Sequence, residues 1–381
     1  MNLLFVNWVE PWVRSVSTIH KYVHAAKAQG HTVSVYGEVS VYGGRNADMP
    51  WLPYTTDLKE VDLALFIVQV PSDFPDMPHL ARILDGIPRD RRVVVDLWGR
   101  FNDTIRLDHD FNHLEKLDGH MGWEWVEAVQ AVSDTVLQPT LSPLRPDVRS
   151  FLFHGFDPGF VAKRHDTARD AAAAWREAGP GEKPYGMMYI GSNWQRWGQV
   201  KRFLEQYGQA GRREIGPATL VGWDWTERPE WAVKKGIVGV DTDMALLADL
   251  GVEVRNGVRF DEVVGQLGKA RFAPVFHRPL FRHLGLVTNR TFETFYADTL
   301  PVLMLPRELV SAVLGPAALA LVPGEDVLAH LRDALRRPEP YWEAVLQTRS
   351  HLARHHSYAQ RYQELEKLFE DRKRPARAGV P

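Results

Sequence analysis

The sequence has no cysteine among its 381 residues. Disulfide bonds, thiolate metal sites and a cysteine nucleophile are therefore excluded. Long hydrophobic runs are also missing, since no stretch approaches the roughly 20 apolar residues that a transmembrane helix needs. The apolar opening, Asn2 to Trp8, lacks the basic residues that begin a signal peptide. From these absences we expect a soluble, cytoplasmic protein without a membrane span.

An excess of charge of either sign is absent too. Lys and Arg number 46 against 48 Asp and Glu, which gives a formal net charge of -2 at pH 7. Without a general positive field we do not expect nucleic acid as a partner. What the sequence does have is 13 tryptophans, which serve core packing or stacking against a ligand. At roughly 100–200 residues per domain, the length predicts two domains.

The first part of the chain alternates apolar runs with helical patterns. Asn2–Trp8 is a buried-strand pattern. Ser17–His31 is a helical pattern, with Ser17 as its expected N-cap and Gly30 as its expected end. Further apolar runs that predict strands lie at residues 32–37, 61–70, 91–99, 128–140 and 150–157. Continuous apolar strands between helices are typical of a parallel sheet that is covered on both faces.

A second series follows an Ala-rich, charged segment that ends in Gly and Pro, residues 166–184. Its strand patterns lie at residues 185–191, 218–223, 251–257, 271–276 and 301–305, and a charged helical pattern fills 338–374. Two such series predict an α/β fold with two Rossmann-like domains facing across a cleft, and a C-terminal helix packing back on the first domain. The expected divisions are residues 1–160, 161–350 and 351–381, the last being the C-terminal helix and tail.

Five segments resemble motifs of a known family, in the same order. "HGFDPGFV" (His154–Val161) is similar to its interdomain turn, and "YIGSNWQRWGQVKRFL" (Tyr189–Leu204) to the strand, glycine and basic helix that open its donor domain. The later motifs are resembled by "VRFDEVVGQLGKARFAPVF" (Val258–Phe276), "TNRTFETFYADTLPVLML" (Thr288–Leu305) and "LALVPGEDVLAHLRDAL" (Leu319–Leu335). The family is that of the retaining glycosyltransferases of GT-B fold, of the glycosyl group 1 (GT4-like) type. The resemblance implies a nucleotide-sugar transferase.

The sequence departs from this family at two positions. The family often has a pair of glutamates at fixed spacing; Glu293 matches the second, but Gly285 stands at the first. Asp298 stands where the family has a glycine. This variant also resembles the glycosyltransferases related to spore-maturation proteins, which keep an Arg-x-Phe-Glu string and lack the first glutamate. The resemblance therefore implies a nucleotide pocket that is altered at its sugar end.

A nucleotide-sugar transferase must bind a ribose and a diphosphate. Glu293, in a predicted helix at the carboxyl edge of the sheet, is the candidate whose carboxylate accepts two ribose hydrogen bonds, unless it is an ordinary solvated helix residue. The polar residues before it stand where that helix begins, and they either bind the diphosphate or only cap the helix. The donor-binding candidates are Glu293, Arg290, Asn289, Thr288, Thr291, Gly191, Ser192, Arg196, Lys201, His277 and Arg278.

Several of these candidates follow strand ends. Gly191 lets the backbone approach a ligand closely. The resemblance assigns Arg196 and Lys201 to a basic pair that neutralises the diphosphate without a metal; the alternative is a solvated helix face. His277 and Arg278 lie in a basic loop that either faces the cleft or is only surface.

The first domain offers a polar loop after the strand pattern at 91–99. Its candidate general bases are Asp96, Asp108 and His109, at the edge of the sheet where an acceptor is expected to bind. The acceptor-binding candidates are Trp8, Glu10, Trp12, Arg14 and Arg100, because sugars stack on aromatic rings. A solvated loop and tryptophans packed in the core would explain the same residues.

These patterns predict a metal-independent transferase that moves a sugar from a nucleotide-diphosphate donor to a hydroxyl of a small molecule or glycan, with retention implied by the resemblance. No cofactor is expected. Asp241, in an Asp-x-Asp string, is expected to cap a helix rather than to bind a metal. The alternatives are a non-hydrolysing nucleotide-sugar epimerase, a DNA-base glucosyltransferase and an inactive binding protein of the same fold.

Overall fold

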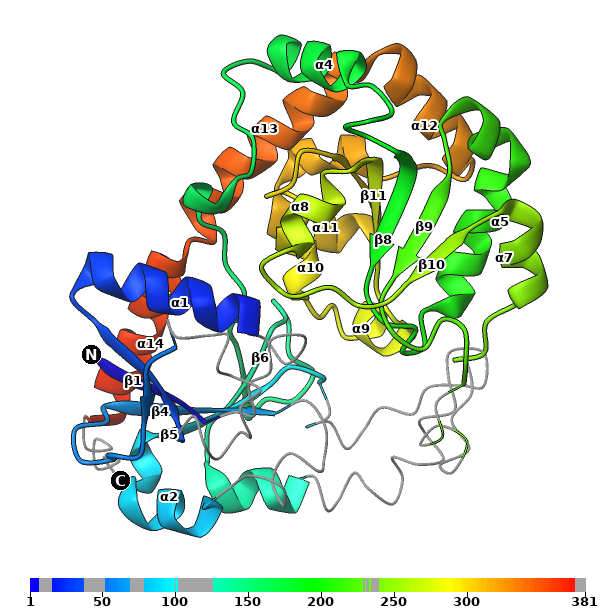
Figure 1. Cartoon of the computed structure of the whole chain (residues 1–381). Coiled ribbons are helices and arrows are strands. Elements are labelled where there is room, and N and C mark those ends of the chain that lie inside the picture. Colours follow the sequence, from blue (N-terminus) through cyan, green and yellow to red (C-terminus); the bar gives the residue numbers. More distant parts are fainter. Residues whose placement is uncertain are drawn as a thin grey trace.

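The computed structural model describes residues 1–6, 16–37, 52–68, 79–99, 101, 126–228, 230, 233 and 240–373. These residues form two separate parallel sheets with helices packed against them (Figure 1). The predicted α/β architecture of two Rossmann-like units is therefore confirmed.

The first sheet has seven strands in the order β3-β2-β1-β4-β5-β6-β7, and all its pairings are parallel. The central strand β4 (Leu63–Val68) is buried along its whole length. Such a strand is apolar at every position because both of its faces are covered, which is why the sequence shows an unbroken run there. The other strands are β1 (Asn2–Val6), β2 (Thr32–Tyr36), β3 (Tyr54–Thr55), β5 (Arg92–Asp96), β6 (Val136–Gln138) and β7 (Val148–Ser150).

The second sheet has five strands in the order β10-β9-β8-β11-β12, again all parallel. They are β8 (Tyr185–Ile190), β9 (Ala218–Val221), β10 (Glu253–Arg255), β11 (Ala270–Phe276) and β12 (Leu300–Met304). The chain builds outward from β8 to β10 and then returns to place β11 on the other side of β8. A crevice opens at the carboxyl ends of the strands where the order reverses in this way, so this edge is the place to look for a ligand site.

Helices and short 3-10 turns connect the strands. In the first unit they are α1 (Val16–Gln29), α2 (Leu80–Gly86), η2 (Arg89–Arg91), a helix over residues 126–132 and η3 (Pro158–Phe160). In the second unit they are α4 (Ala168–Glu177), α5 (Trp197–Glu214), α7 (Met244–Leu250), α8 (Val263–Leu267), α9 (Pro279–His283), α10 (Asn289–Glu293), α11 (Arg307–Leu314), η4 (Pro316–Leu321) and α12 (Val327–Arg336). The chain ends in α13 (Pro338–His355) and α14 (Tyr358–Lys373).

The single charged helix predicted at the C-terminus is two helices. Ser357 interrupts it, because its hydroxyl accepts from the backbone N–H of Gln360 and the Gln360 side chain accepts from the backbone N–H of Ser357, which is a capping box. The break turns α14 onto the first unit. There the Tyr362 hydroxyl donates a hydrogen bond of 2.8 Å to the carbonyl of Tyr22 in α1. The prediction that the C-terminal helix packs back on the first domain is confirmed.

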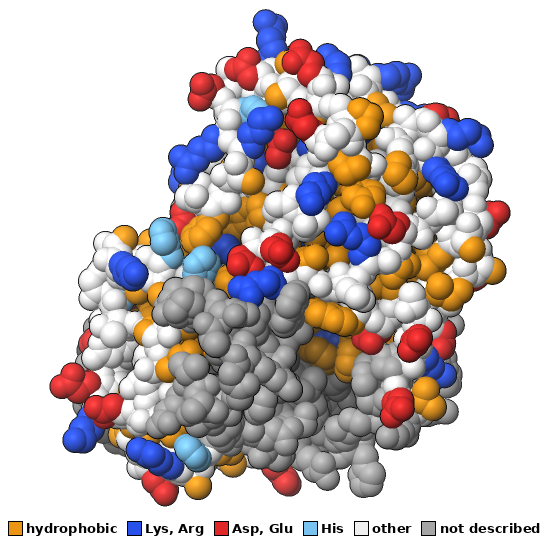
Figure 2. Space-filling model, viewed as in Figure 1, with side chains coloured by type: hydrophobic (Ala, Val, Ile, Leu, Met, Phe, Trp, Pro, Cys, Tyr) orange, Lys and Arg blue, Asp and Glu red, His pale blue; other side chains and the backbone are white. Residues whose placement is uncertain are grey.

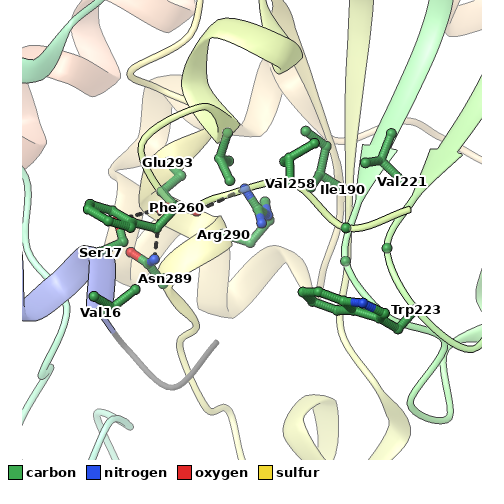
Figure 3. A pocket seen from close by; sticks show the side chains of 14 residues that line it. Val16, Ser17, Ile190, Val221, Trp223, Val258, Phe260, Asn289, Arg290 and Glu293 are labelled. Carbon is green, nitrogen blue, oxygen red and sulfur yellow. Dashed lines mark hydrogen bonds and ion pairs between the residues drawn. The ribbon is translucent and has the colours of Figure 1, made fainter. Parts of the chain in front are cut away.

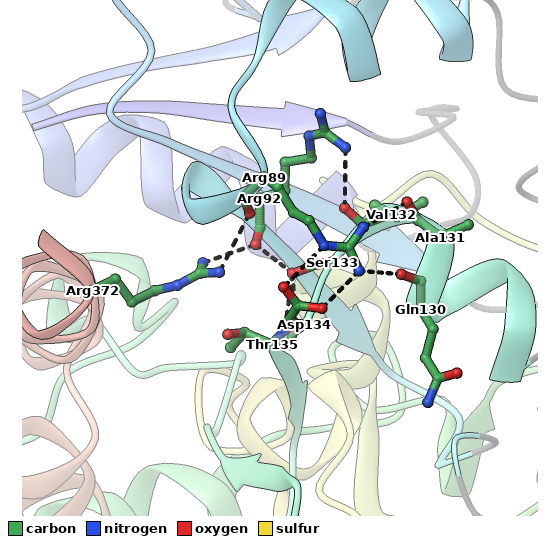
Figure 4. Close-up of polar contacts among 9 residues, drawn as sticks. All are labelled: Arg89, Arg92, Gln130, Ala131, Val132, Ser133, Asp134, Thr135 and Arg372. Carbon is green, nitrogen blue, oxygen red and sulfur yellow. Dashed lines mark hydrogen bonds and ion pairs between the residues drawn. The ribbon is translucent and has the colours of Figure 1, made fainter. Parts of the chain in front are cut away.

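The last turn of α14 is hydrogen-bonded to the first residue of β5 and to the 3-10 turn before it. Arg372 donates to the carbonyls of Arg92 and Arg89, and Arg89 in turn forms a two-pronged pair with Asp134 (Figure 4). The Ser133 hydroxyl also donates to the carbonyl of Arg92. These backbone carbonyls are satisfied by side chains from distant parts of the chain, so α14 is an integral part of the first unit.

Two units meet directly where the loops after β6 and α9 pass each other. The backbone N–H of Val287 donates to the carbonyl of Pro139 at 2.7 Å, and the Thr140 hydroxyl donates to the carbonyl of Leu284 at 2.9 Å. These bonds join residues of the first unit to residues of the second, which brings α10 close to α1.

Three local predictions are wrong. The run at residues 128–140, expected as a strand, begins inside a helix over residues 126–132, and only Val136–Gln138 form a strand. The cap of α7 is Asp243, whose carboxylate accepts from the backbone N–H of Leu246, whereas Asp241 pairs with Arg228. Residues 151–157, expected as a strand, do not form one, and among the described contacts only the N–H of Phe151 still donates to a strand, at the carbonyl of Gln138 in β6. Farther along, the backbone bonds to helical segments: the Tyr22 hydroxyl donates to the Phe153 carbonyl, and the N–H of Phe156 donates to the carbonyl of His356. An apolar run in a sequence does not show which groups its backbone N–H and C=O will bond to.

Candidate functional site

A pocket lies at the carboxyl edge of the second sheet, beside the point where its strand order reverses (Figure 3). It is closed on one side by the first turn of α1, which belongs to the other unit. Its lining residues are Val16, Ser17, Ile190, Gly191, Val221, Gly222, Trp223, Gly257, Val258, Phe260, Val263, Asn289, Arg290 and Glu293. Most of this surface is apolar, and its charged groups come from the short helix α10.

Glu293 is the buried acid of this pocket, with only 2% of its surface exposed. Its Oε1 accepts hydrogen bonds from the Ser17 hydroxyl at 2.7 Å and from the Asn289 side-chain amide at 2.8 Å. Its Oε2 forms an ion pair with Nη1 of Arg290 at 2.8 Å. Glu293 is therefore not a solvated helix residue, and three partners fix the orientation of its carboxylate.

The charge of Glu293 is retained despite burial. Burial alone would raise the pKa of Glu293, but Arg290, Lys21 and the hydrogen bonds from Ser17 and Asn289 lower it below its ordinary value. A carboxylate that stays ionised in an apolar pocket remains a strong acceptor for hydroxyl groups. It is the kind of group that holds a polar ligand in a fixed place.

Lys21 supports this arrangement from α1. Its Nζ donates to the Ser17 hydroxyl at 2.6 Å and to the Ser17 carbonyl at 3.1 Å, and it also lies 5.2 Å from the ring centre of Tyr296. Burial lowers the pKa of Lys21, and Glu293 opposes that shift. The first unit thus brings a hydroxyl and a buried ammonium group to the acid of the second.

Three glycines form the pocket wall because the backbones there approach closely. A Cβ on Gly222, whose φ is +149°, would lie 2.3 Å from the carbonyl oxygen of Gly191. A Cβ on Gly257 would lie 2.4 Å from the indole of Trp223. Trp223 is 40% exposed and presents a large aromatic surface at the end of the pocket away from Glu293 (Figure 3).

The polar run before Glu293 is mostly occupied in shaping its own turn. The hydroxyls of Thr288 and Thr291 lie 3.2 Å apart, and the Thr291 hydroxyl also accepts from the backbone N–H of Thr288. Nε2 of His277 lies 3.2 Å from the same Thr291 hydroxyl. Neither threonine lines the pocket, whereas Asn289 and Arg290 do.

Acid is expected to destabilise the protein in part through His277. Burial, with Arg196, Arg278 and Arg282 nearby, lowers the pKa of His277 from 6.5 to about 3. At a pH between the unfolded and the folded pKa, His277 is protonated in the unfolded chain but not in the folded one. Stability therefore falls as the pH drops through this window. The free energy of unfolding of the wild type should fall between about pH 7 and about pH 5, and in His277→Gln this fall should be smaller by about 1–2 kcal/mol. Urea denaturation at the two pH values measures it. His283→Gln, at an exposed site, is the control, and an unchanged pH dependence in His277→Gln would contradict this assignment.

The basic candidates lie in three different settings. Arg196 donates from Nη1 to the carbonyl of Ser192, while its buried Nε has no hydrogen-bond partner among the described residues. Arg278 is stacked between the rings of Trp98 and Phe281, at 3.9 and 3.8 Å, which places it at the junction of the two units rather than on the pocket wall. His277 is buried and uncharged near neutral pH, so it is not a cation for a phosphate.

Lys201 lies on an exposed face of α5. It pairs with Asp243 at 3.5 Å and with Glu205 at 3.9 Å, and it is not among the residues that line the pocket. This is the solvated helix face that was the alternative to a ligand role.

The first-domain candidate that the structure describes is Asp96, and it holds a turn together. It is fully buried, its Oδ1 accepts from the backbone N–H of Trp98, and its Oδ2 accepts from the N–H of Phe101 and from the Gln138 amide. A carboxylate used in this way is not open to an acceptor. The other first-domain candidates lie outside the described residues: Trp8, Glu10, Trp12, Arg14, Arg100, Asp108 and His109.

The two departures from the family pattern have local explanations. Gly285 has a φ of +59°, which favours glycine, and it ends the turn after α9. Asp298 lies before β12, at the opposite edge of the sheet from the pocket, where Lys183, Lys163 and His165 surround its carboxylate. Neither residue lines the pocket.

The sequence reasoning missed two contributions to the site. Ser17 was interpreted as a helix cap, but it lies inside α1 and its hydroxyl binds Glu293. Lys21 was not singled out at all. A serine and a lysine four positions apart in a helical pattern were the available signal, because they lie on one helix face.

Three general features complete the description of the residues that the structure covers. Among these residues, no cluster of three or more His, Asp or Glu side chains is arranged to hold a metal ion. Acidic and basic side chains are interspersed over the face that Figure 2 shows. No helix among the described residues has the length and apolar character that crossing a membrane requires.

No protein-family model matches this sequence, and no curated protein matches it either. Solved structures do. A T4 phage BGT mutant in complex with UDP-glucose has a TM-score of 0.55 at 12% identity, covering 97% of this chain and 100% of that one. Anabaena HepE in complex with UDP-glucose has a TM-score of 0.56 at 10% identity, covering 97% and 100%. An alpha-glucosyltransferase in complex with UDP and a 13-mer DNA has a TM-score of 0.56 at 11% identity, covering 97% and 99%. At such low identity these likenesses establish the fold: this chain has the GT-B fold of glycosyltransferases.

Proposed function

We propose that this protein is a glycosyltransferase that moves a sugar from a nucleoside-diphosphate sugar to an acceptor hydroxyl. The observation that carries the proposal is Glu293, an ionised and buried carboxylate in a pocket at the carboxyl edge of the second sheet. A carboxylate in this position suits the two hydroxyls of a ribose, because it accepts two hydrogen bonds and donates none.

The diphosphate is assigned to the cations beside Glu293. Arg290 lines the pocket with 21% of its side chain exposed, so its guanidinium can reach a ligand while it stays paired with Glu293. Arg196 follows β8, and its buried Nε has no hydrogen-bond partner among the described residues. A guanidinium forms strong, directional bonds to phosphate oxygens, which suits stabilisation of a leaving diphosphate without a metal.

Retention of configuration belongs to the proposal because of the family that the sequence resembles. In that mechanism the leaving phosphate itself takes the proton of the acceptor hydroxyl, so no separate base is needed. This agrees with the structural use of Asp96, whose carboxylate is filled by backbone and amide donors. The acceptor is assigned to the first unit and is a small molecule or a glycan.

The test is a thermal-shift screen against UDP, GDP, dTDP, ADP and CMP. UDP is the first choice because the three similar structures hold UDP or UDP-glucose. A ligand at about 100 times its Kd adds about 2.7 kcal/mol of stability and raises Tm. Glu293→Gln should abolish most of that rise. If no nucleotide shifts Tm in the wild type, the proposal is wrong.

The screen extends to the alternatives. Turnover of the sugar nucleotide without any acceptor would favour an epimerase. Binding of DNA that weakens steeply with salt would favour a DNA-base glucosyltransferase, since phosphate contacts release counterions. The net charge of -2 argues against that reading. Nucleotide binding with no turnover in the presence of acceptors would favour a binding protein.

A further inference from the structure

Ser17 and Glu293 are 276 residues apart in the sequence, yet their side chains meet in the pocket. Ser17 belongs to α1 in the first unit, and Glu293 ends α10 in the second. The hydroxyl lies 2.7 Å from Oε1, and both residues are almost fully buried. This bond therefore joins the two units at the residue that carries the proposed donor site.

The direction of this hydrogen bond is set by Lys21. An ammonium group only donates, so Nζ of Lys21, 2.6 Å from the Ser17 hydroxyl oxygen, must use that oxygen as an acceptor. The single proton of Ser17 is then left to point at Glu293. Ser17 consequently acts toward Glu293 as a neutral alcohol that donates one strong hydrogen bond to an ionised acceptor.

The carboxylate of Glu293 has little capacity left. Each carboxylate oxygen accepts about two hydrogen bonds. Oε1 already accepts from Ser17 and Asn289, and Oε2 is paired with Arg290. A ribose diol brings two donors, so one of the present partners has to leave when the diol binds.

Ser17 is the partner that is able to leave. Asn289 and Arg290 lie on α10 itself, within four residues of Glu293, and move with it. Ser17 is attached to the other unit, so a small separation of the units withdraws it without disturbing α10. Its hydroxyl also has the same chemistry as the sugar hydroxyl that would replace it.

We propose that the Ser17 hydroxyl occupies, in the ligand-free protein, the place on Glu293 that a ribose hydroxyl of the donor takes over. This inference rests on the proposed function and adds to it a link between donor binding and the contact of the two units. The ribose hydroxyls gain their bond to Glu293 only at the expense of the bond from Ser17. Ser17 thereby lowers the affinity for nucleotides that carry both hydroxyls, and has little effect on those that lack them.

The experiment compares UDP, or whichever nucleotide of the screen binds, with its 2′,3′-dideoxy form by calorimetric titration. The measured quantity is the Kd of the dideoxy form divided by the Kd of the normal nucleotide. This ratio does not depend on the fraction of each variant that is folded. In Ser17→Ala the ratio should increase about tenfold over the wild type, because the hydroxyls no longer displace a charge-assisted bond. Ser17→Gly, which also lacks the hydroxyl, should behave in the same way.

Thr18→Ala is the matched control. Thr18 is the next residue on α1 and is also buried, but its hydroxyl bonds to Nδ1 of His154 and not to Glu293. Its ratio should equal that of the wild type. A ratio in Ser17→Ala that is unchanged or smaller would overturn the inference while leaving the proposed function intact.

Failure of the proposed function looks different. In that case the wild type binds none of the nucleotides, or it binds the normal and dideoxy forms equally well and Glu293→Gln changes neither. Either result also ends the inference about Ser17, because no ribose would then reach Glu293.

Discussion

Glu293→Ala is expected to lower the free energy of unfolding by about 3–5 kcal/mol and to abolish nucleotide binding. The loss of stability follows because the buried ammonium group of Lys21 and the partly exposed guanidinium of Arg290 would both lose the carboxylate that balances them. Removing one member of a buried ionic group costs more than the group contributes as a whole, since the remaining charge is left without compensation. The measurement is urea denaturation of the ligand-free protein.

Two variants separate charge from packing. Glu293→Gln keeps the shape and an acceptor for Ser17 and Asn289, so it should be less destabilised than Glu293→Ala but should bind nucleotide no better. Glu214→Ala removes an exposed partner of Arg332 and should change stability little. A Glu293→Ala protein as stable as Glu214→Ala would show that the buried charges in the pocket do not depend on one another.

Gly222→Ala is expected to lower nucleotide affinity at least about tenfold and stability by about 2–4 kcal/mol. The new Cβ would lie 2.3 Å from the carbonyl oxygen of Gly191 and 3.0 Å from the N atom of Ser192, and neither backbone atom can swing aside as a side-chain end does. This clash is relieved only if the loop after β8 shifts. That loop forms part of the pocket wall and leads to Arg196. Urea denaturation and nucleotide titration measure the two effects.

Gly198→Ala is the control for Gly222→Ala. Gly198 lies in α5, and a Cβ there meets no atom within 4 Å. Alanine should raise stability by about 0.5–1 kcal/mol, because it restricts the unfolded chain and favours the helix. Should Gly222→Ala bind nucleotide as well as Gly198→Ala does, the loop after β8 would have no part in the site.

Much of the fold could be predicted because parallel sheets leave a direct trace in the sequence. β4 is buried at all six positions, and its apolar run is unbroken. Gly30, with a φ of +70°, ends α1 as its position after a helical pattern predicted. The break at Ser357 was missed because the charged pattern continues on both sides of it, and only a reciprocal pair of hydrogen bonds marks the end of one helix.

The site could be predicted only in part, because half of it is formed by distant contacts. Glu293 was singled out through its place after a polar run and before a strand, and it does line the pocket. Ser17 was assigned to the wrong role because a serine at the start of a helix usually caps it, and no local pattern shows that a residue 276 positions away accepts its proton. Asp96 had the position of a general base, but its carboxylate accepts from the N–H of Phe101 and from the amide of Gln138, which lies far from it along the chain.

The placement of α14 has a consequence for how the protein is made. Its side chains Tyr358, Tyr362 and Leu365 are part of the same apolar core as Leu3 and Phe5, and they are synthesised after every strand of the second unit. Domains usually fold in the order in which they are synthesised. Here the first unit must wait, with part of its core open to water, until the second has been translated completely. The nascent chain is therefore exposed to aggregation for longest in its first unit, whose core closes only after α14 has been translated.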